Sequence, residues 1–187
     1  LGGGSLMMWR KFLGPKARII GIDRNPKAVE LRKHGFEIFI GDQADPSFWS
    51  QVIPALGAVD VVLDDGGHTY SQQVETLIAL LPCVNDGGLV VVEDTHTSYM
   101  PGFGPTRHTF MKFAYKFVDG INKRFGSFES NKSTAASGPV WNIQFFESIV
   151  CFHIDRQRAG LLSQTTQNMK PTELVEDFRF GAPGQKK

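Results

Sequence analysis

The sequence predicts one α/β domain with a doubly wound, mostly parallel sheet that ends in an antiparallel hairpin. Short β-branched runs alternate with segments of helical periodicity along the first half of the chain. Two of these runs are followed by an Asn-Pro or Asp-Pro pair, which is typical of a helix start. Near residue 150, two strand-like runs are separated only by Glu147 and Ser148. Alternation of this kind favours parallel strands joined by right-handed crossover helices.

The individual elements follow from local patterns. Strands are expected at residues 18–23, 36–40, 59–63, 89–92, 141–146 and 149–154. Helices are expected from residue 6, at 25–35, from 45 to about 53, from 69 to about 81, and at 108–125. Thr69 and Gln72 form a capping box, and Gly87-Gly88 is expected to end the helix that follows it. The run at 89–92 is almost wholly apolar, which predicts helices on both of its faces.

Composition limits the class of protein. Hydrophobic residues make up 41% and charged residues 21% of 187 residues, as in ordinary globular domains. The net charge of +1 disfavours nucleic acid or an anionic membrane as a partner, and no apolar run approaches the roughly 20 residues of a membrane span. Cys83 and Cys151 lie in apolar runs, which favours reduced thiols. We therefore expect a soluble cytoplasmic protein, with homo-oligomer formation left open.

The first strands end in residues suited to a nucleoside. Ligands of open parallel sheets bind at the carboxyl ends of the strands. Asp23 could bind ribose hydroxyls or cap a turn, and Asp42 with Gln43 could bind an adenine edge, although Asp42 could equally cap a turn. A glycine run before the first helix would let backbone N–H groups approach an anion; it comprises Gly3, Gly4 and Ser5 with Gly2. Because the run lacks G-x-G-x-x-G spacing, it favours a nucleoside bearing a carboxylate over a dinucleotide.

The next two strands end in clustered acids. Asp64, Asp65 and His68 follow one strand, and Glu93 with Asp94 follows the next. Neighbouring strands lie about 4.8 Å apart, so these carboxylates can converge on one cation. Carboxylate oxygens without a thiolate or imidazole set suit Mg²⁺ or another hard divalent ion. The alternative interpretation makes Asp65 and Asp94 helix caps and His68 a turn residue.

Five segments together resemble a known family. LGGGSLMMW, IIGID, GDQAD, VLDDGGH and VVVEDTHTSY are similar to the metal-dependent O-methyltransferases of macrolide sugars, of the mycinamicin and macrocin type, and to cephalosporin-hydroxylase-like proteins. The similarity covers residues 1–154, and the DDGGH and EDTHTSY segments are its most specific part. It implies a Rossmann-like class I methyltransferase fold that uses S-adenosylmethionine, with residues 141–154 as its terminal hairpin.

The resemblance also implies roles for single residues. Asp23 would bind the cofactor's ribose, and Asp42 and Gln43 would lie at its adenine. The methionine part would be lined by Gly3, Gly4 and Ser5. Asp64 is counted with this cofactor-binding set. The implied metal ligands are Asp65, Glu93 and Asp94, with His68 as catalytic base, and the choice between Asp64 and Asp65 as ligand stays open.

These roles form a consistent reaction. A cation that binds a hydroxyl lowers its pKa, and a nearby imidazole can take the proton while the methyl group is transferred. The expected acceptor is a hydroxylated small molecule, such as a sugar or polyketide glycoside in antibiotic biosynthesis, and a vicinal diol fits best. Residues 97–105 form either a lid over this acceptor or an ordinary surface loop.

The family pattern begins with a strand that this sequence does not show. That strand would lie between those at 18–23 and 59–63, so we expect the first strand to be missing and the natural protein to extend upstream of Leu1. Residues 1–154 then form an N-terminally incomplete methyltransferase domain, and residues 155–187 a polar tail with a short helix at 173–178. Two alternative functions are an NAD-type oxidoreductase, favoured by Asp23 but opposed by the glycine spacing, and a non-catalytic cofactor-binding module.

Overall fold

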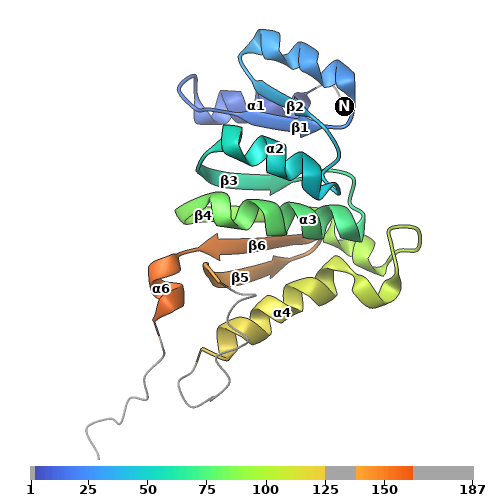
Figure 1. Cartoon of the computed structure of the whole chain (residues 1–187), viewed down its shortest axis with the longest axis vertical. Helices are drawn as coiled ribbons and strands as arrows, with labels where there is room; N and C mark the ends of the chain where they lie inside the picture. Colours follow the sequence, from blue (N-terminus) through green and yellow to red (C-terminus); the bar gives the residue numbers. More distant parts are fainter. Residues whose placement is uncertain (1–2, 125–137, 162–187) are drawn as a thin grey trace, which may run out of the picture.

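The computed structural model describes residues 3–124 and 138–161, which form an α/β fold (Figure 1). The described strands form two sheets, a parallel pair β1-β2 and a four-stranded sheet of order β3-β4-β6-β5. Strands β3 and β4 are parallel, whereas β6 runs antiparallel to both β4 and β5. The strands are β1 (Ile20–Asp23), β2 (Glu37–Ile40), β3 (Val59–Asp64), β4 (Val84–Val92), β5 (Val140–Phe146) and β6 (Ile149–Ile154). The predicted fold class and its terminal hairpin are confirmed.

Most helices begin where the sequence predicts. The α-helices are α1 (Gly4–Leu13), α2 (Pro46–Leu56), α3 (Tyr70–Leu80), α4 (Phe110–Asn122) and α6 (Arg156–Gly160), and the 3-10 helices are η1 (Pro26–His34), η2 (Leu81–Cys83), η3 (Thr95–Tyr99) and η4 (Thr106–His108). The Asp45 side chain caps α2, and Thr69 with Gln72 forms the expected capping box of α3.

Two predicted elements differ in detail. The segment after Asn25 is the 3-10 helix η1, in which residues three apart share a face; Ala28 and Leu31 use this spacing to pack on the β1-β2 sheet. Helix α3 ends at Leu80, because Pro82 follows and the chain tightens into η2. The Gly87-Gly88 pair therefore does not end a helix but lies inside β4. A Cβ on Gly88 would overlap the Asp60 carbonyl of β3, so the close strand approach requires glycine.

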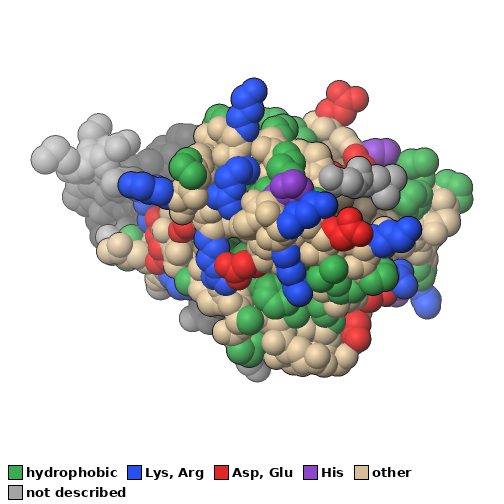
Figure 2. Space-filling view, turned by 90° about the horizontal axis from the view of Figure 1, so that it is seen from above, with side chains coloured by type: hydrophobic (Ala, Val, Ile, Leu, Met, Phe, Trp, Pro, Cys, Tyr) green, Lys and Arg blue, Asp and Glu red, His purple; other side chains and the backbone are tan. Residues whose placement is uncertain are grey.

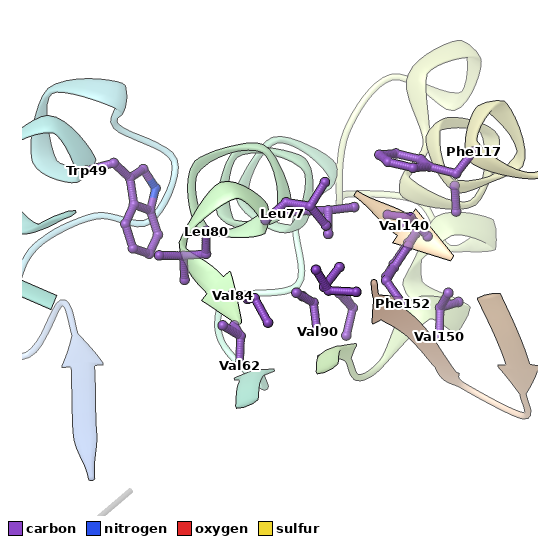
Figure 3. Packing of buried hydrophobic residues seen from close by; sticks show 14 of the residues in the cluster. Trp49, Val62, Leu77, Leu80, Val84, Val90, Phe117, Val140, Val150 and Phe152 are labelled. Atoms are coloured by element: carbon purple, nitrogen blue, oxygen red, sulfur yellow. The ribbon is translucent and has the colours of Figure 1, made fainter. Parts of the chain in front are cut away.

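The main core lies between the four-stranded sheet and the helices α2, α3 and α4 (Figure 3). Leu77 of α3 and Val90 of β4 are fully buried at its centre. Phe152 of β6 packs edge-to-face with Phe117 of α4, with ring centroids 5.3 Å apart. A smaller cluster joins α1 and η1 to the β1-β2 sheet through Ile19, Phe36 and Ile38.

The two sheets are separate, and one apolar face is partly open. No strand of the described residues pairs with β1 on the side opposite β2, or with β3 on the side opposite β4. Val61 of β3 is 60% exposed, and Leu89 and Val91 of β4 are half-buried while Val90 and Val92 are buried. One face of residues 89–92 is therefore buried in the main core, whereas the face with Leu89 and Val91 is only half-buried, and helices over that second face stay a prediction.

The end of the molecule that carries η1 shows charges of both signs. Figure 2 shows Lys and Arg side chains interspersed there with Asp, Glu and apolar side chains. Among residues 3–124 and 138–161, no helix combines the length and apolarity needed to cross a membrane. The short helix α6 was not predicted, although Asp155 caps it through Arg158 N. The predicted loop at 126–139 lies mostly, and the predicted helix at 173–178 entirely, outside the described residues.

Candidate active site

The polar ends of the parallel strands gather at one edge of the fold. Asp23 is the last residue of β1, Asp42 follows β2, Asp64 is the last residue of β3, and Glu93 follows β4. The Gln43 side chain crosses between the two sheets, because its Nε2 donates to Asp64 Oδ1 at 2.9 Å. The structure therefore brings the ends of β2 and β3 together, and a common binding site formed by all four strand ends stays a prediction.

The two candidate nucleoside-binding acids take part in turns. Asp23 Oδ1 accepts a hydrogen bond from Asn25 N at 2.8 Å, and Asp42 Oδ1 accepts one from Ala44 N at 2.9 Å. Asp42 Oδ2 also lies 3.5 Å from the guanidinium of Arg24. The capping role considered for both acids is thus present. Their cofactor-binding role stays a prediction.

The N-terminus of α1 is formed by the glycine run. Gly3 has φ +75°, and a Cβ there would lie 2.6 Å from the Leu31 side chain, so glycine is required. Gly3 is the N-cap and gives no side-chain hydrogen bond, and Gly4 and Ser5 are exposed. The first N–H groups of a helix have no intrahelical partner, so this end can bind an anionic group such as a carboxylate.

Asp65, His68 and Asp94 form one cluster. A carboxylate oxygen or imidazole nitrogen of each lies within 4.8 Å of the others. His68 Nε2 is 3.4 Å from Asp94 Oδ2 and 4.0 Å from Asp65 Oδ1. The structure therefore brings together three of the four residues assigned to the metal and the catalytic base, and His68 faces the acids.

Unusual backbone conformations create this arrangement. His68 has φ +58° and Asp94 has φ +53°, in the left-handed region that residues with side chains rarely adopt. The Thr97 hydroxyl lies between the two residues, because its Oγ1 is 3.0 Å from the His68 carbonyl oxygen and 2.8 Å from the Asp94 carbonyl oxygen, and its single proton can be donated to either. Such strained positions concentrate at functional sites.

Asp64 and Asp65 point to different surroundings, as neighbours at the end of a strand do. Asp64 is 6% exposed and accepts hydrogen bonds from Gln43 and Gly66, whereas Asp65 is exposed and joins the cluster. The geometry favours Asp65 as the metal ligand. Burial raises the pKa of Asp64.

Glu93 completes the negative edge of the cluster. Burial raises its pKa, and the charges of Asp65 and Asp94 raise it further while His68 lowers it. Ion pairs within the described residues give Asp65 and Asp94 only histidine partners. Carboxylates that repel one another in this way fit a hard divalent cation, which would neutralise them.

The raised pKa of Glu93 predicts an effect of pH on stability. Folding favours the protonated form of the Glu93 carboxyl, so protonation of this group stabilises the folded state. This contribution to the free energy of unfolding is fully present below the unfolded pKa of about 4.3 and is lost as the pH rises through the folded pKa. We expect MgCl₂ to oppose this loss in urea unfolding curves measured across that window.

Glu93→Gln should reduce both the pH-dependent loss and its reversal by Mg²⁺. Glu30→Gln on the exposed surface of η1 serves as the matched control and should retain both effects. The raised pKa of Asp64 gives a pH dependence of the same sign in every variant. The test therefore compares the pH dependence of Glu93→Gln with that of Glu30→Gln and the unmodified chain. Equal pH and Mg²⁺ dependence in Glu93→Gln and the unmodified chain would contradict the assignment.

The segment considered as a lid is anchored at several points. Tyr70 of α3 donates from its hydroxyl to the carbonyl of Met100 at 3.2 Å, and its backbone N–H donates to Phe103 O at 3.0 Å. Gly104 lies against the Tyr70 ring, where a Cβ would overlap it. Tyr99 is nevertheless 74% exposed. Whether residues 97–105 cover an acceptor stays a prediction.

Sequence reasoning missed several supporting residues. Gln73 of α3 is buried, and its Nε2 donates to the Glu93 carbonyl at 2.9 Å. His96 Nδ1 lies 2.5 Å from Ser148 Oγ in the β5-β6 turn and 3.9 Å from Asp94 Oδ1. The spacing of Thr97 three residues after Asp94 was visible in the sequence, whereas the contacts of Gln73 and Ser148 depend on tertiary structure.

This fold, with acids at one pair of strand ends and an acid and histidine cluster at the next, is typical of α/β proteins that bind a nucleoside cofactor. The profile of a family described as a methyltransferase domain matches residues 1–95, and the chain belongs to this family. The resemblance to sugar O-methyltransferases is confirmed by curated relatives and solved structures.

Among the similar proteins is mycinamicin VI 2''-O-methyltransferase of Micromonospora griseorubida, 42% identical over 105 residues, which are 55% of this chain and 26% of that protein. A tetracenomycin rhamnosyl 2'-O-methyltransferase of Streptomyces olivaceus is 35% identical over 65% of this chain and 32% of its own length. The MycE methyltransferase of the mycinamycin pathway, solved with Mg and S-adenosylhomocysteine, aligns with a TM-score of 0.75 and 28% identity over 83% of this chain and 42% of its own. The chain thus spans less than half the length of these relatives.

Proposed function

We propose that the chain is an S-adenosylmethionine-dependent O-methyltransferase that acts on a hydroxyl of a small molecule in the presence of Mg²⁺ or another hard divalent ion. The cluster of Asp65, His68 and Asp94 at the carboxyl edge of the sheet carries this proposal. Its relatives are O-methyltransferases that act on glycosylated natural products, which favours a sugar or polyketide glycoside as acceptor. The same relatives disfavour the nicotinamide-dependent alternative.

Different residues would bind the cofactor and the divalent ion. The N-terminus of α1, with Gly3, Gly4 and Ser5, would bind the cofactor's carboxylate, and Asp23 and Asp42 would bind its nucleoside. Asp65, Glu93 and Asp94 would hold the divalent ion, which when bound lowers the pKa of an acceptor hydroxyl.

His68 would act as the general base. Its Nε2 faces Asp94 and Asp65, so it can accept the hydroxyl proton at the point where the acceptor oxygen attacks the methyl group. The left-handed backbone at His68, which the Thr97 hydroxyl stabilises, holds the ring in this place.

The proposal includes the organisation of the chain. Residues 1–154 would form the methyltransferase domain, with β1-β2 and the four-stranded sheet as its two described sheets. The free thiols of Cys83 and Cys151 support the predicted cytoplasmic location.

Calorimetric titration with S-adenosylhomocysteine tests the cofactor class. We expect binding with and without EDTA, and no comparable binding of NAD⁺. Methyl transfer from labelled S-adenosylmethionine is then measured with methyl rhamnoside and with mycinamicin VI, in Mg²⁺ and in EDTA. Absence of S-adenosylhomocysteine binding would reject the proposal, and binding without transfer to any diol would favour a non-catalytic module.

A further inference from the structure

The Gln43 side chain is occupied within the protein. Its Nε2 donates to Asp64 Oδ1 at 2.9 Å and to Thr76 Oγ1 at 3.0 Å, and its Oε1 accepts from Gly67 N at 3.2 Å. The backbone is fixed as well, because Gln43 O accepts from Trp49 Nε1 at 2.8 Å. An amide nitrogen has two N–H groups, and both are used. The Gln43 side chain therefore has no N–H left for an adenine ring.

The partners of Gln43 define the loop that carries the site. The Gly66 N–H donates to the Asp64 carboxylate, and the Gly67 N–H donates to Gln43 Oε1. Two consecutive backbone N–H groups are therefore hydrogen-bonded to side chains. A Cβ on Gly66 would overlap Gln43 Oε1, and one on Gly67 would overlap the Gln72 side chain. The two glycines thus lie between two glutamine side chains, which explains the need for glycine although neither has a positive φ.

The same loop places the reactive groups. Asp65 precedes the glycine pair and His68 follows it, and both belong to the cluster with Asp94. The Thr97 hydroxyl fixes the loop at His68 O, whereas Gln43 and Asp64 fix it at the glycines. Movement of the glycine pair would therefore displace Asp65 and His68 together.

We propose that Gln43 is a positioning residue for the metal site, which holds the Gly66-Gly67 loop so that Asp65 and His68 face Asp94, rather than a residue that binds adenine. This inference rests on the proposed function, because it concerns the same site. It also links the two halves of the site, since Asp42 lies next to Gln43 at the end of β2. Residues that orient metal ligands typically change metal affinity by about 10- to 100-fold when they are replaced.

The test compares Gln43→Met with the unmodified chain. Methionine keeps the length and most of the volume but makes none of the three hydrogen bonds. We expect Mn²⁺ affinity, measured from the free Mn²⁺ signal in electron paramagnetic resonance, to fall by about 10-fold or more. Amide exchange at Gly67 should become faster, because its acceptor is lost. Affinity for S-adenosylhomocysteine in EDTA should stay within about twofold of the unmodified chain.

Gln51→Met on the exposed surface of α2 is the matched control and should change none of the three quantities. If Gln43→Met does not fold by circular dichroism, Gln43→Asn replaces it. Asn keeps the amide, but it is one methylene too short to reach Asp64 and Gly67 together. The same three results are expected from it.

Each other outcome rejects the inference. Weaker binding of S-adenosylhomocysteine with unchanged Mn²⁺ affinity would place Gln43 at the cofactor, and unchanged or equally weakened affinities would mean that it does not position the metal loop. In these cases the unmodified chain still binds both probes, so the proposed function stands. Absence of Mn²⁺ binding by the unmodified chain would instead reject both the inference and the metal dependence of the proposed reaction.

Discussion

His68→Asn is expected to reduce methyl transfer by about 10²- to 10⁴-fold, which is the usual contribution of a general base. The proton of the acceptor hydroxyl would lose its acceptor at Nε2, which lies 3.4 Å from Asp94 Oδ2. Asn is preferred to Ala in this test because it tolerates the positive φ of residue 68. Turnover is measured with labelled S-adenosylmethionine and the glycoside acceptors, at saturating Mg²⁺.

The same variant should bind S-adenosylhomocysteine and Mn²⁺ within a few-fold of the unmodified chain. Loss of turnover with retained binding identifies His68 as the base, because weaker binding as well would mean that the loop had moved. His34→Asn, at the exposed end of η1, should have full activity. Undiminished turnover of His68→Asn would show that another group, such as His96, takes the proton.

Local signals explain why much of the site was predictable from the sequence. The capping box at Thr69 and Gln72 and the acids after the β-branched runs depend on neighbours a few residues away. The strand alternation and the terminal hairpin have the same origin. Once the strands are parallel, Asp65 and Asp94 must lie at the same edge, so their convergence follows from the fold.

The remaining features depend on contacts between distant segments. The role of Gln43 follows from a hydrogen bond to Asp64, 21 residues away, and nothing near Gln43 in the sequence indicates it. The need for glycine at position 88 comes from the close approach of the Asp60 carbonyl on the neighbouring strand. The sequence does not show this contact, and on local pattern alone the glycine pair indicates a helix end. The open sheet face at Val61 likewise depends on which segments lie over it.

Phe152→Ala is expected to lower the free energy of unfolding by about 3–5 kcal/mol, because it removes a large side chain from a closed site. Phe152 is fully buried in β6, between Phe110 and Phe117 of α4, with ring centroids 6.4 Å and 5.3 Å away. The contact between Phe117 and Phe152 joins α4 to the terminal hairpin (Figure 3). Urea unfolding followed by circular dichroism measures the change.

Phe146→Ala on the adjacent strand β5 is the matched control. Phe146 is 58% exposed, so its removal leaves no cavity and should cost less than about 1 kcal/mol. Phe152→Leu should lie between the two, because leucine refills part of the space. If Phe152→Ala and Phe146→Ala were equally destabilising, the side of the hairpin that faces α4 would not be the core side. Ser148 O in the same hairpin accepts a hydrogen bond from Thr95 N at 3.0 Å. The same result would therefore also contradict this contact between the hairpin and the loop after Glu93.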